Sequence, residues 1–386
     1  MKVEQIYNLI NTVTTENLGE SIIVSEDLSN LVDVGKEFEN SVGLDNFVRS
    51  LVDHVGRMVF VDRVYGGRAP SVLVDGWEYG SILEKISVAL PEAQENEVWD
   101  LQDGQSYDPN VFKKPNVTAK FFNDRITFDI QLSITTKQVK SAFDSVNQMN
   151  AFASMLYTSV NNSATIKTDA LIMRAINNMI GDTLYSEFPS GTYTGTGVRA
   201  VNLLKLYNDT LPDSATPLTK ADFMHSPDAI RHSIYVFKNY IDRIKVMSTL
   251  FNMGGQSRFT PDDRLHIVML SEFANSADVF LQSDTFNEEY TALPRAERTV
   301  YWQGSGVDYD FESTSALKIT TSSGHTIDTD GIIAVMFDRD ALGVANVDRY
   351  VTSNYNAKAD FTNNFYHFTQ GLWNDQNENF LVFYVQ

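Results

Sequence analysis

A strict alternation of apolar and polar residues gives the clearest strand signal in this sequence. In residues 126–134, Ile, Phe or Leu occupies every even position and Thr, Asp, Gln or Ser occupies every odd position. A period of two is typical of a strand with one buried face and one solvated face. We predict that this strand pairs with Met58–Val64 and that the two form the base of a long hairpin. A connection of about 50 residues between paired strands is unusual in a compact domain and indicates a functional role or a partner.

Helical spacing dominates the middle of the chain. Apolar residues recur at intervals of three or four over residues 139–160, and a second helical run covers residues 168–180. These intervals place side chains on one face of a helix. We therefore predict one long helical region that is interrupted near residues 161–164. A separate amphipathic helix is predicted from Pro227 to the glycine pair at 254–255, because glycine commonly ends a helix.

Four segments in the C-terminal half are predicted to form β-strands. Residues 265–270 and 331–337 are continuous apolar runs, which are typical of strands buried on both faces. A helix is predicted directly after the first of them, over residues 271–282. Two aromatic runs, residues 363–373 and 378–385, close the chain, and we predict that they form a strand pair.

An acidic segment lies between residues 75 and 110. It holds nine acidic residues and a single base, Lys85, and it also contains Trp77 and Trp99. Such a segment is too charged for a core and too rich in apolar residues for a plain linker. We therefore predict a projecting arm that covers another surface or is covered by one. A solvated loop with two isolated tryptophans is the alternative.

The overall charge narrows the choice of partners. The 386 residues include 30 Lys and Arg against 50 Asp and Glu, which gives a formal net charge of −20. A negative surface repels nucleic-acid backbones, so a generic nucleic-acid-binding protein is disfavoured. A container that encloses DNA without adhering to it is still compatible with this charge. The chain has no cysteine, which excludes disulfides, a thiolate nucleophile and cysteine-ligated metal sites.

The sequence shows no sign of export or of a membrane span. No stretch approaches the roughly 18 consecutive apolar residues that a membrane helix requires. The first 20 residues carry acids and amides where a signal peptide needs an apolar stretch. We expect a soluble protein that is made in a cytoplasm and has no membrane partner.

A search for catalytic, cofactor and metal sites gives no candidate residues. No HExxH, GxSxG or SxxK motif is present. The GxGxxA match at residues 195–200 lacks the βαβ unit of a dinucleotide site. His225 and His232 with Asp228 have a spacing like that of metal ligands, but the helix is predicted to start at Pro227, after His225. We therefore predict no catalytic residue, no cofactor and no metal.

The order of these elements resembles that of a known family. A loose N-terminal arm, a long acidic hairpin, a long helix, two buried strands and closing aromatic strands are similar to the parts of the major capsid protein of tailed bacteriophages. That family has the Hong Kong 97-type head fold, and the resemblance is strongest to the group from small short-tailed phages. The stretches that carry it are residues 45–64, 115–134, 141–162, 264–287 and 331–356.

The resemblance implies an α+β fold of the Hong Kong 97 type with five parts. These are an N-terminal arm at 1–45, a peripheral domain with the spine helix at 46–65 and 119–226, an extended loop at 66–118, an axial domain at 227–350, and C-terminal strands at 351–386 that return to the peripheral domain.

The resemblance also implies a structural role and no enzymatic activity. The chain would assemble with itself into pentamers and hexamers of an icosahedral head shell around phage double-stranded DNA. Assembly would take place in the host cytoplasm, with scaffolding protein and portal as further partners. An arm that lies across the adjacent subunit makes four residues the candidate intersubunit contacts: Trp77, Trp99, Lys113 and Lys114. Some relatives crosslink a lysine to an asparagine, but no acceptor is identified here, and the two lysines are interpreted as a basic spot that pairs with the acidic arm.

Three other function classes are kept as alternatives. An encapsulin-like nanocompartment shell would need a groove for a cargo peptide. A carboxylate-based hydrolase would need acids gathered in one cleft with a perturbed pKa among them. An acidic carbohydrate-binding module would need exposed aromatic residues along a groove, whereas Trp302 and Trp373 fall in predicted strands.

Overall fold

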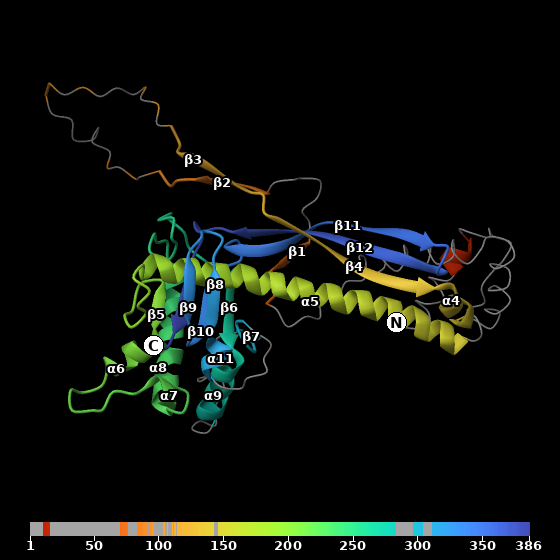
Figure 1. Ribbon diagram of the computed structural model, residues 1–386. Coiled ribbons are helices and arrows are strands. Elements are labelled where there is room, and N and C mark those ends of the chain that lie inside the picture. The colour runs from red at the N-terminus through yellow and green to blue at the C-terminus, as the bar shows by residue number, and fades with distance from the viewer. Residues whose placement is uncertain are drawn as a thin grey trace.

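The computed structural model contains two main β-sheets, one long helix and one projecting hairpin (Figure 1). This mixture of helices and sheets confirms the predicted α+β class. The structure describes isolated positions between 93 and 112 and the residues 11–15, 70–75, 83–91, 114–142, 146–282, 296–303 and 311–386.

The first main sheet has four strands in the order β1–β11–β12–β4. β11 (Leu342–Asn356) and β12 (Phe361–Asn374) form a long antiparallel pair, and β4 (Arg125–Thr135) lies antiparallel along the other side of β12. The short β1 (Leu73–Asp75) pairs in parallel with β11. Exposed and more buried residues alternate along β4, which confirms the predicted strand with one covered face.

One continuous helix runs beneath this sheet (Figure 1). It is α5 (Val146–Glu187), with 42 residues, and it follows the short α4 (Thr136–Ala142). The predicted interruption near residues 161–164 is therefore wrong. The polar residues there fit a helix, because the Thr165 hydroxyl donates to the Asn161 carbonyl oxygen at 2.9 Å.

The helix also continues past Gly181, where a small sheet packs against it. This sheet consists of β8 (Leu317–Thr320) and β9 (Thr326–Thr329) and follows the short α11 (Phe311–Ser315). A Cβ atom at Gly181 would lie 2.6 Å from Cγ2 of Thr321, so glycine allows the close approach of helix and sheet.

The second main sheet has five strands in the order β5–β13–β10–β6–β7. Its central strand β10 (Ile332–Asp338) lies between β13 (Phe380–Tyr384) and β6 (Leu265–Leu270), and every residue of β10 and β13 is buried. The short strands β5 (Ala200–Asn202) and β7 (Glu297–Thr299) form its edges. The two continuous apolar runs predicted as buried strands are thus confirmed as β6 and β10.

Helices cover both faces of the five-stranded sheet. α5 supplies one face, and the other is covered by α6 (Leu203–Asn208), α7 (Lys220–Phe223), α8 (Pro227–Ile244) and α9 (Ser271–Gln282). α9 has the predicted bounds, and α8 begins at the predicted proline. However, α8 ends at Ile244, well before the glycine pair that was expected to end it.

The chain passes between the two main sheets three times. The first passage runs from β4 through α4 and α5 to β5, and the other two are short. Residues 339–341 lead from β10 to β11, and residues 375–379 lead from β12 to β13. The predicted pairing of the two aromatic runs is wrong, because β12 pairs with β11 and β4, whereas β13 pairs with β10 and β5. Their burial differs accordingly: most of β12 alternates between buried and half-buried residues, and β13 is buried throughout.

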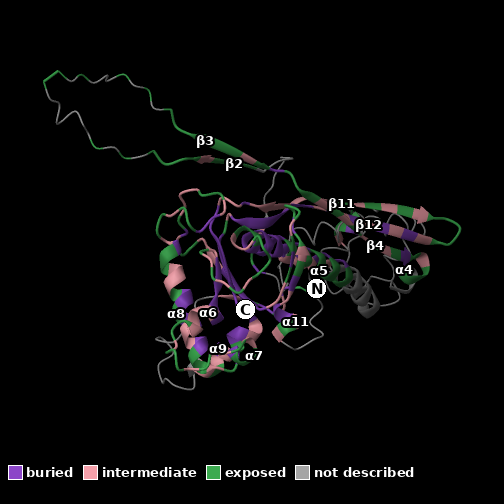
Figure 2. Cartoon of the chain, turned by 60° about the vertical axis from the view of Figure 1, so that its left-hand side comes forward, coloured by how far each residue is buried: buried purple, intermediate pink, exposed green. Residues whose placement is uncertain are grey.

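A two-stranded hairpin projects from this body (Figure 1). It consists of β2 (Leu83–Val88) and β3 (Val117–Phe122), and its strands are mostly exposed, in contrast to the buried interior of the body (Figure 2). Residues 58–64, the predicted partner of β4, lie outside the described residues, as does most of the predicted N-terminal arm. Within the described ranges, no helix has the length and hydropathy that a membrane span requires.

Candidate functional site

The projecting hairpin has two faces of different chemistry. In its antiparallel register, each residue shares a face with the residue directly opposite. Lys85 and Lys120 stand opposite each other on one face, which we call the lysine face. The other face, which we call the apolar face, carries Glu84 at one end and otherwise consists of Ile86, Val88, Val117, Ala119 and Phe121.

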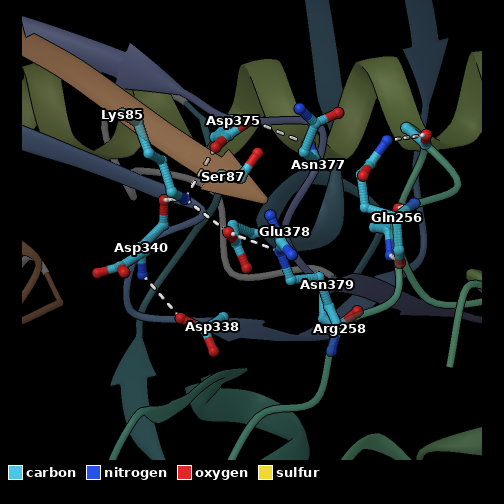
Figure 3. Close-up of polar contacts among 12 residues, drawn as sticks. Lys85, Ser87, Gln256, Arg258, Asp338, Asp340, Asp375, Asn377, Glu378 and Asn379 are labelled. Atoms are coloured by element: carbon cyan, nitrogen blue, oxygen red, sulfur yellow. Dashed lines mark hydrogen bonds and ion pairs between the residues drawn. The ribbon is translucent and has the colours of Figure 1, made fainter. Parts of the chain in front are cut away.

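The lysine face is held on the body by a buried carboxylate. Two lysines side by side repel each other unless an acid neutralises them. Oδ2 of Asp375 lies 2.8 Å from Nζ of Lys85, and its Oδ1 lies 2.9 Å from Nζ of Lys120. Glu378 adds a 2.6 Å contact from its Oε1 to Nζ of Lys85 (Figure 3). The hairpin is therefore attached through the segment between β12 and β13.

Glu378 also binds the loop that connects α8 to β6. Nε of Arg258 in that loop lies 3.2 Å from Oε1 of Glu378 (Figure 3). We call these five charged residues the anchor cluster: Lys85, Lys120, Arg258, Asp375 and Glu378. Its two carboxylates are almost completely buried, with side-chain exposures of 2% for Asp375 and 8% for Glu378. Removing one partner of such a pair is costly, because a charge is left buried without its counterion.

The pKa of Asp375 reflects this environment. Burial alone raises the pKa of the carboxyl group, because it disfavours the charged form. The hydrogen bond and positive charge of Lys85, the hydrogen bond of Lys120 and the backbone N–H of Asn377 outweigh burial and lower the pKa below its ordinary value. Asp375 is therefore ionised at neutral pH, as its ion pairs require.

Backbone hydrogen bonds fix the segment that carries the two carboxylates. The Asp375 N–H donates to the Ala341 carbonyl oxygen at 2.6 Å, and the Gly254 N–H donates to the Gln376 carbonyl oxygen at 2.9 Å. A Cβ atom at Gly254 would lie 1.9 Å from Oδ1 of Asn377, so the close approach of these two segments requires glycine there or a shift of Asn377.

The other short segment between the sheets, residues 339–341, lies next to the same cluster. The Asp340 carbonyl oxygen accepts a 3.5 Å hydrogen bond from Nζ of Lys85 (Figure 3). Nη2 of Arg264 lies 3.2 Å from Oδ1 of Asp338 and also binds the Asp340 carboxylate. Lys85 thus contacts both of the short segments that lead the chain from one main sheet to the other.

The apolar face of the hairpin is open to solvent. The exposed fractions are 62% for Ile86, 51% for Val88, 53% for Val117 and 60% for Phe121. A two-stranded ribbon is only marginally stable by itself, and a bare apolar face is typical of a surface that another molecule covers.

Of the four candidate contacts predicted from the sequence, one can be placed. Lys114 is exposed and lies shortly before β3, while Trp77, Trp99 and Lys113 lie outside the described residues. Their roles stay predictions. In the described part of the chain, no group of three His, Asp or Glu side chains could hold a metal ion.

The residues of the anchor cluster were missed by sequence reasoning. The available signal was Lys85, the single base in the acidic segment, because an isolated cation there needs a specific reason. Nothing in the local sequence indicates its partners, since Asp375 and Glu378 are about 290 residues away and are two acids among 50.

Comparison with known proteins assigns the chain to a family. A family model described as the Phi29-like phage major capsid protein matches residues 10–384. The chain belongs to this family. Its resemblance to the capsid proteins of short-tailed phages is thereby confirmed, and the family is that of a structural component of the virion head.

A curated relative and two solved structures are also similar to this chain. The major capsid protein of Bacillus phage GA-1 is 26% identical over 203 residues, which are 51% of this chain and 41% of that relative. The match thus spans less than half of the relative's length. One similar solved structure is the capsid of Staphylococcus phage Andhra, with a TM-score of 0.46 and 10% identity. Another is a structure of the head fiber and inner core protein gp22 of bacteriophage P68, with a TM-score of 0.48 and 12% identity. They cover 84% and 83% of this chain, which in turn covers 86% and 85% of theirs.

Three parts that the sequence analysis expected are present in the described residues. They are the extended hairpin β2–β3, the long helix α5 and a second region built on the sheet of β10 and β6.

Proposed function

We propose that this chain assembles with itself into pentamers and hexamers of an icosahedral head shell that encloses phage double-stranded DNA. Membership in the Phi29-like major capsid family supports the shell, and the projecting hairpin supports the mode of assembly. The observation that carries the proposal is the bare apolar face on a hairpin whose opposite face is fixed to the body by ion pairs.

The hairpin has the properties of an arm that lies on a neighbouring copy. The anchor cluster fixes its base, so it projects in a defined direction. Its apolar face then loses contact with water only when another surface covers it. An extended segment that packs on a neighbour is a known way of joining subunits, and many such contacts together stabilise a shell even if each is weak.

We further propose how the domains divide. The peripheral domain would comprise the four-stranded sheet and the long helix, and the axial domain would comprise the five-stranded sheet with α6 to α9. The chain would pass between them at residues 188–199, 339–341 and 375–379. This division differs from the sequence-based boundary at residue 350, which falls inside β11.

The net charge of −20 is compatible with a shell that encloses DNA and does not bind its phosphate backbone. Scaffolding protein and portal are proposed as further partners, and the host cytoplasm as the place of assembly. The encapsulin-like shell and the carboxylate-based hydrolase are less well supported, because the family of the chain is that of a phage head protein.

The experiment measures assembly of the full chain and of matched variants by mass photometry and negative-stain imaging at increasing salt. The wild-type chain should form rings, sheets or shells of megadalton mass, and salt should favour them by screening the repulsion between subunits. Ile86→Asp with Val88→Asp should prevent assembly, whereas Val279→Asp, a change at an equally exposed apolar residue on α9, should not. A double variant that assembles like the wild type would contradict the proposed role of the hairpin. A wild-type chain that stays a 43.4 kDa monomer at every salt concentration would contradict self-assembly.

A further inference from the structure

The exposed large apolar side chains of the described residues gather in two places. Of the seventeen such side chains, six lie on the hairpin or its flanks and four lie on the loop between α8 and β6. The others are spread singly over the surface, where isolated apolar residues are normal. The four loop residues, which we call the loop patch, are Val246, Met247, Leu250 and Phe259, with exposures of 64%, 46%, 57% and 49%.

The loop patch is built on a fixed backbone. Ser248 and Arg258 form an antiparallel bridge, with N–H to carbonyl distances of 2.9 and 3.0 Å in the two directions. This bridge places Met247 next to Phe259 across the loop. The loop is also tied to the five-stranded sheet, because the Phe380 N–H donates to the Phe251 carbonyl oxygen at 2.9 Å. The patch is therefore a preformed surface.

The chain cannot cover its own loop patch with the apolar face of its own hairpin. The anchor cluster turns the lysine face toward the body, so the apolar face points the opposite way. Glu378 binds both Lys85 of the hairpin and Arg258 of the patch loop, which fixes the two surfaces relative to each other. Each copy thus carries two separate apolar surfaces. One is the apolar face of its hairpin, and the other is the loop patch.

We infer that the loop patch of one copy receives the apolar face of the hairpin of a second copy. This inference rests on the proposed function and adds to it the surface on which the hairpin docks. Two different patches in contact form a head-to-tail interface, which generates closed rings when the rotation between copies closes. In such a ring, every apolar face and every loop patch is covered.

The size of the contact fits a ring better than an isolated dimer. Strands of six residues are about 20 Å long, so a two-stranded face covers only a fraction of the roughly 800 Å² per partner in a standard stable interface. A single contact is therefore weak, and it becomes effective when many copies make it at once. The patch pair should thus act in the assembled state and leave the free subunit monomeric at low salt.

The absence of cysteine allows a direct test of this contact. The full chain with Val88→Cys and Leu250→Cys is assembled, treated with a short bis-maleimide crosslinker, and analysed on a denaturing gel. We expect a ladder of dimers, trimers and larger species, because each copy donates one thiol and receives another. Val88→Cys with Val279→Cys is the matched control, since Val279 is exposed on α9, outside the loop patch, and it should give at least tenfold less interchain product.

A mixing experiment identifies the link as one between copies. Chains with Val88→Cys alone are co-assembled with chains that carry Leu250→Cys alone, and crosslinked dimers containing one chain of each kind should form. Particles of normal mass that yield no more product than the control pair would overturn the inference while leaving the proposed function intact. If the variant Ile86→Asp with Val88→Asp assembles normally, this result contradicts the proposed role of the hairpin itself, and the inference about the loop patch falls with it. Thermal unfolding of each variant as a monomer is the control that tests whether its fold is preserved.

Discussion

The five-stranded sheet and the projecting hairpin both carry apolar strands, but they cover them in different ways. In the sheet, every residue of β10 and β13 is buried between α5 on one face and the group α6 to α9 on the other. In the hairpin, one face is held by ion pairs and the other is open to solvent. The first region is covered by its own chain, and we propose that a second copy covers the open face of the other.

The two regions also depend on different forces. Apolar contact dominates the five-stranded sheet, so its stability should vary little with pH. The hairpin is attached to the body through charged groups, so its attachment should depend on their ionisation. Changes in the sheet should therefore unfold the subunit, whereas changes in the hairpin should leave a folded subunit that cannot assemble.

The largest effect on stability is expected from Phe383→Ala in the centre of the sheet. Phe383 is fully buried, and its ring lies 4.8 Å from that of Phe237 and 5.4 Å from that of Tyr240, centroid to centroid. The cavity and the lost contacts should lower the free energy of unfolding by about 3–5 kcal/mol. Urea unfolding of the monomer at low salt measures the change. A loss below about 1 kcal/mol, the size typical of an average substitution, would show that this sheet is not the centre of stability.

A smaller loss is expected from Asp375→Asn in the anchor cluster. Asparagine keeps the shape of the side chain but removes the negative charge that pairs with both Lys85 and Lys120. We expect the free energy of unfolding to fall by about 2 kcal/mol, less than for a fully buried pair because both lysines are partly solvated. Hydrogen exchange of the amides in β2 and β3 should accelerate more than exchange elsewhere.

The matched control for this substitution is Asp262→Asn. Asp262 pairs with Lys245 at 2.8 Å, but its side chain is 74% exposed. An exposed ion pair contributes little, so this change should cost less than about 0.5 kcal/mol. Equal losses for the two substitutions would contradict a special role for the anchor cluster.

A smaller effect is expected from pH, through the contribution of Asp375 to the free energy of unfolding. Because the pKa of Asp375 is lower in the folded state than in the unfolded chain, its contribution is complete above the ordinary carboxyl value of about 4 and is lost as pH falls through the lowered pKa. The difference in free energy of unfolding between the wild type and Asp375→Asn should therefore shrink below about pH 4. Parallel unfolding series from pH 7 to pH 2.5 measure it. A difference that stays constant over this range would argue against ionised Asp375 as the anchor.

The smallest effect on the free subunit is expected from Ile86→Ser on the apolar face. Ile86 is 62% exposed, so its replacement should change the free energy of unfolding of the monomer by no more than about 0.5 kcal/mol. The same variant should assemble less than the wild type, as measured by light scattering at high salt. A clear loss of monomer stability would mean that the apolar face packs within its own chain.

Much of the fold could be predicted because its patterns are local. The continuous apolar runs of β6 and β10, the alternation in β4 and the start of α8 at a proline each depend on a few neighbouring residues. Burial then follows from the pattern. The resemblance to phage capsid proteins could also be predicted, because the order of these elements along the chain is similar to the order in that family.

The errors arose where local polarity conflicts with tertiary packing or where pairing is distant. Residues 161–164 are polar enough to suggest a break, yet the helix continues, with Ala164 buried and Thr165 bonded to the turn before it. The two aromatic runs looked alike as strands, but one alternates in burial and the other does not, and they belong to different sheets. Pairing between strands far apart in sequence leaves no local signature.

The anchor cluster shows the same limit at the level of the site. Lys85 stood out in the acidic segment, but the partners that give it a role come from the far end of the chain. A sequence can show that a residue is unusual without showing what it meets in space.

We expect a neighbouring copy to cover the apolar face of the hairpin. Imaging of assembled particles by electron cryomicroscopy, at a resolution that traces β2 and β3, tests this expectation most directly. We expect a closed shell in which each hairpin keeps its lysine face on its own anchor cluster and packs its apolar face on the adjacent subunit. A shell in which the hairpins project freely into solvent, or fold back so that Ile86 and Val88 contact their own chain, would contradict it.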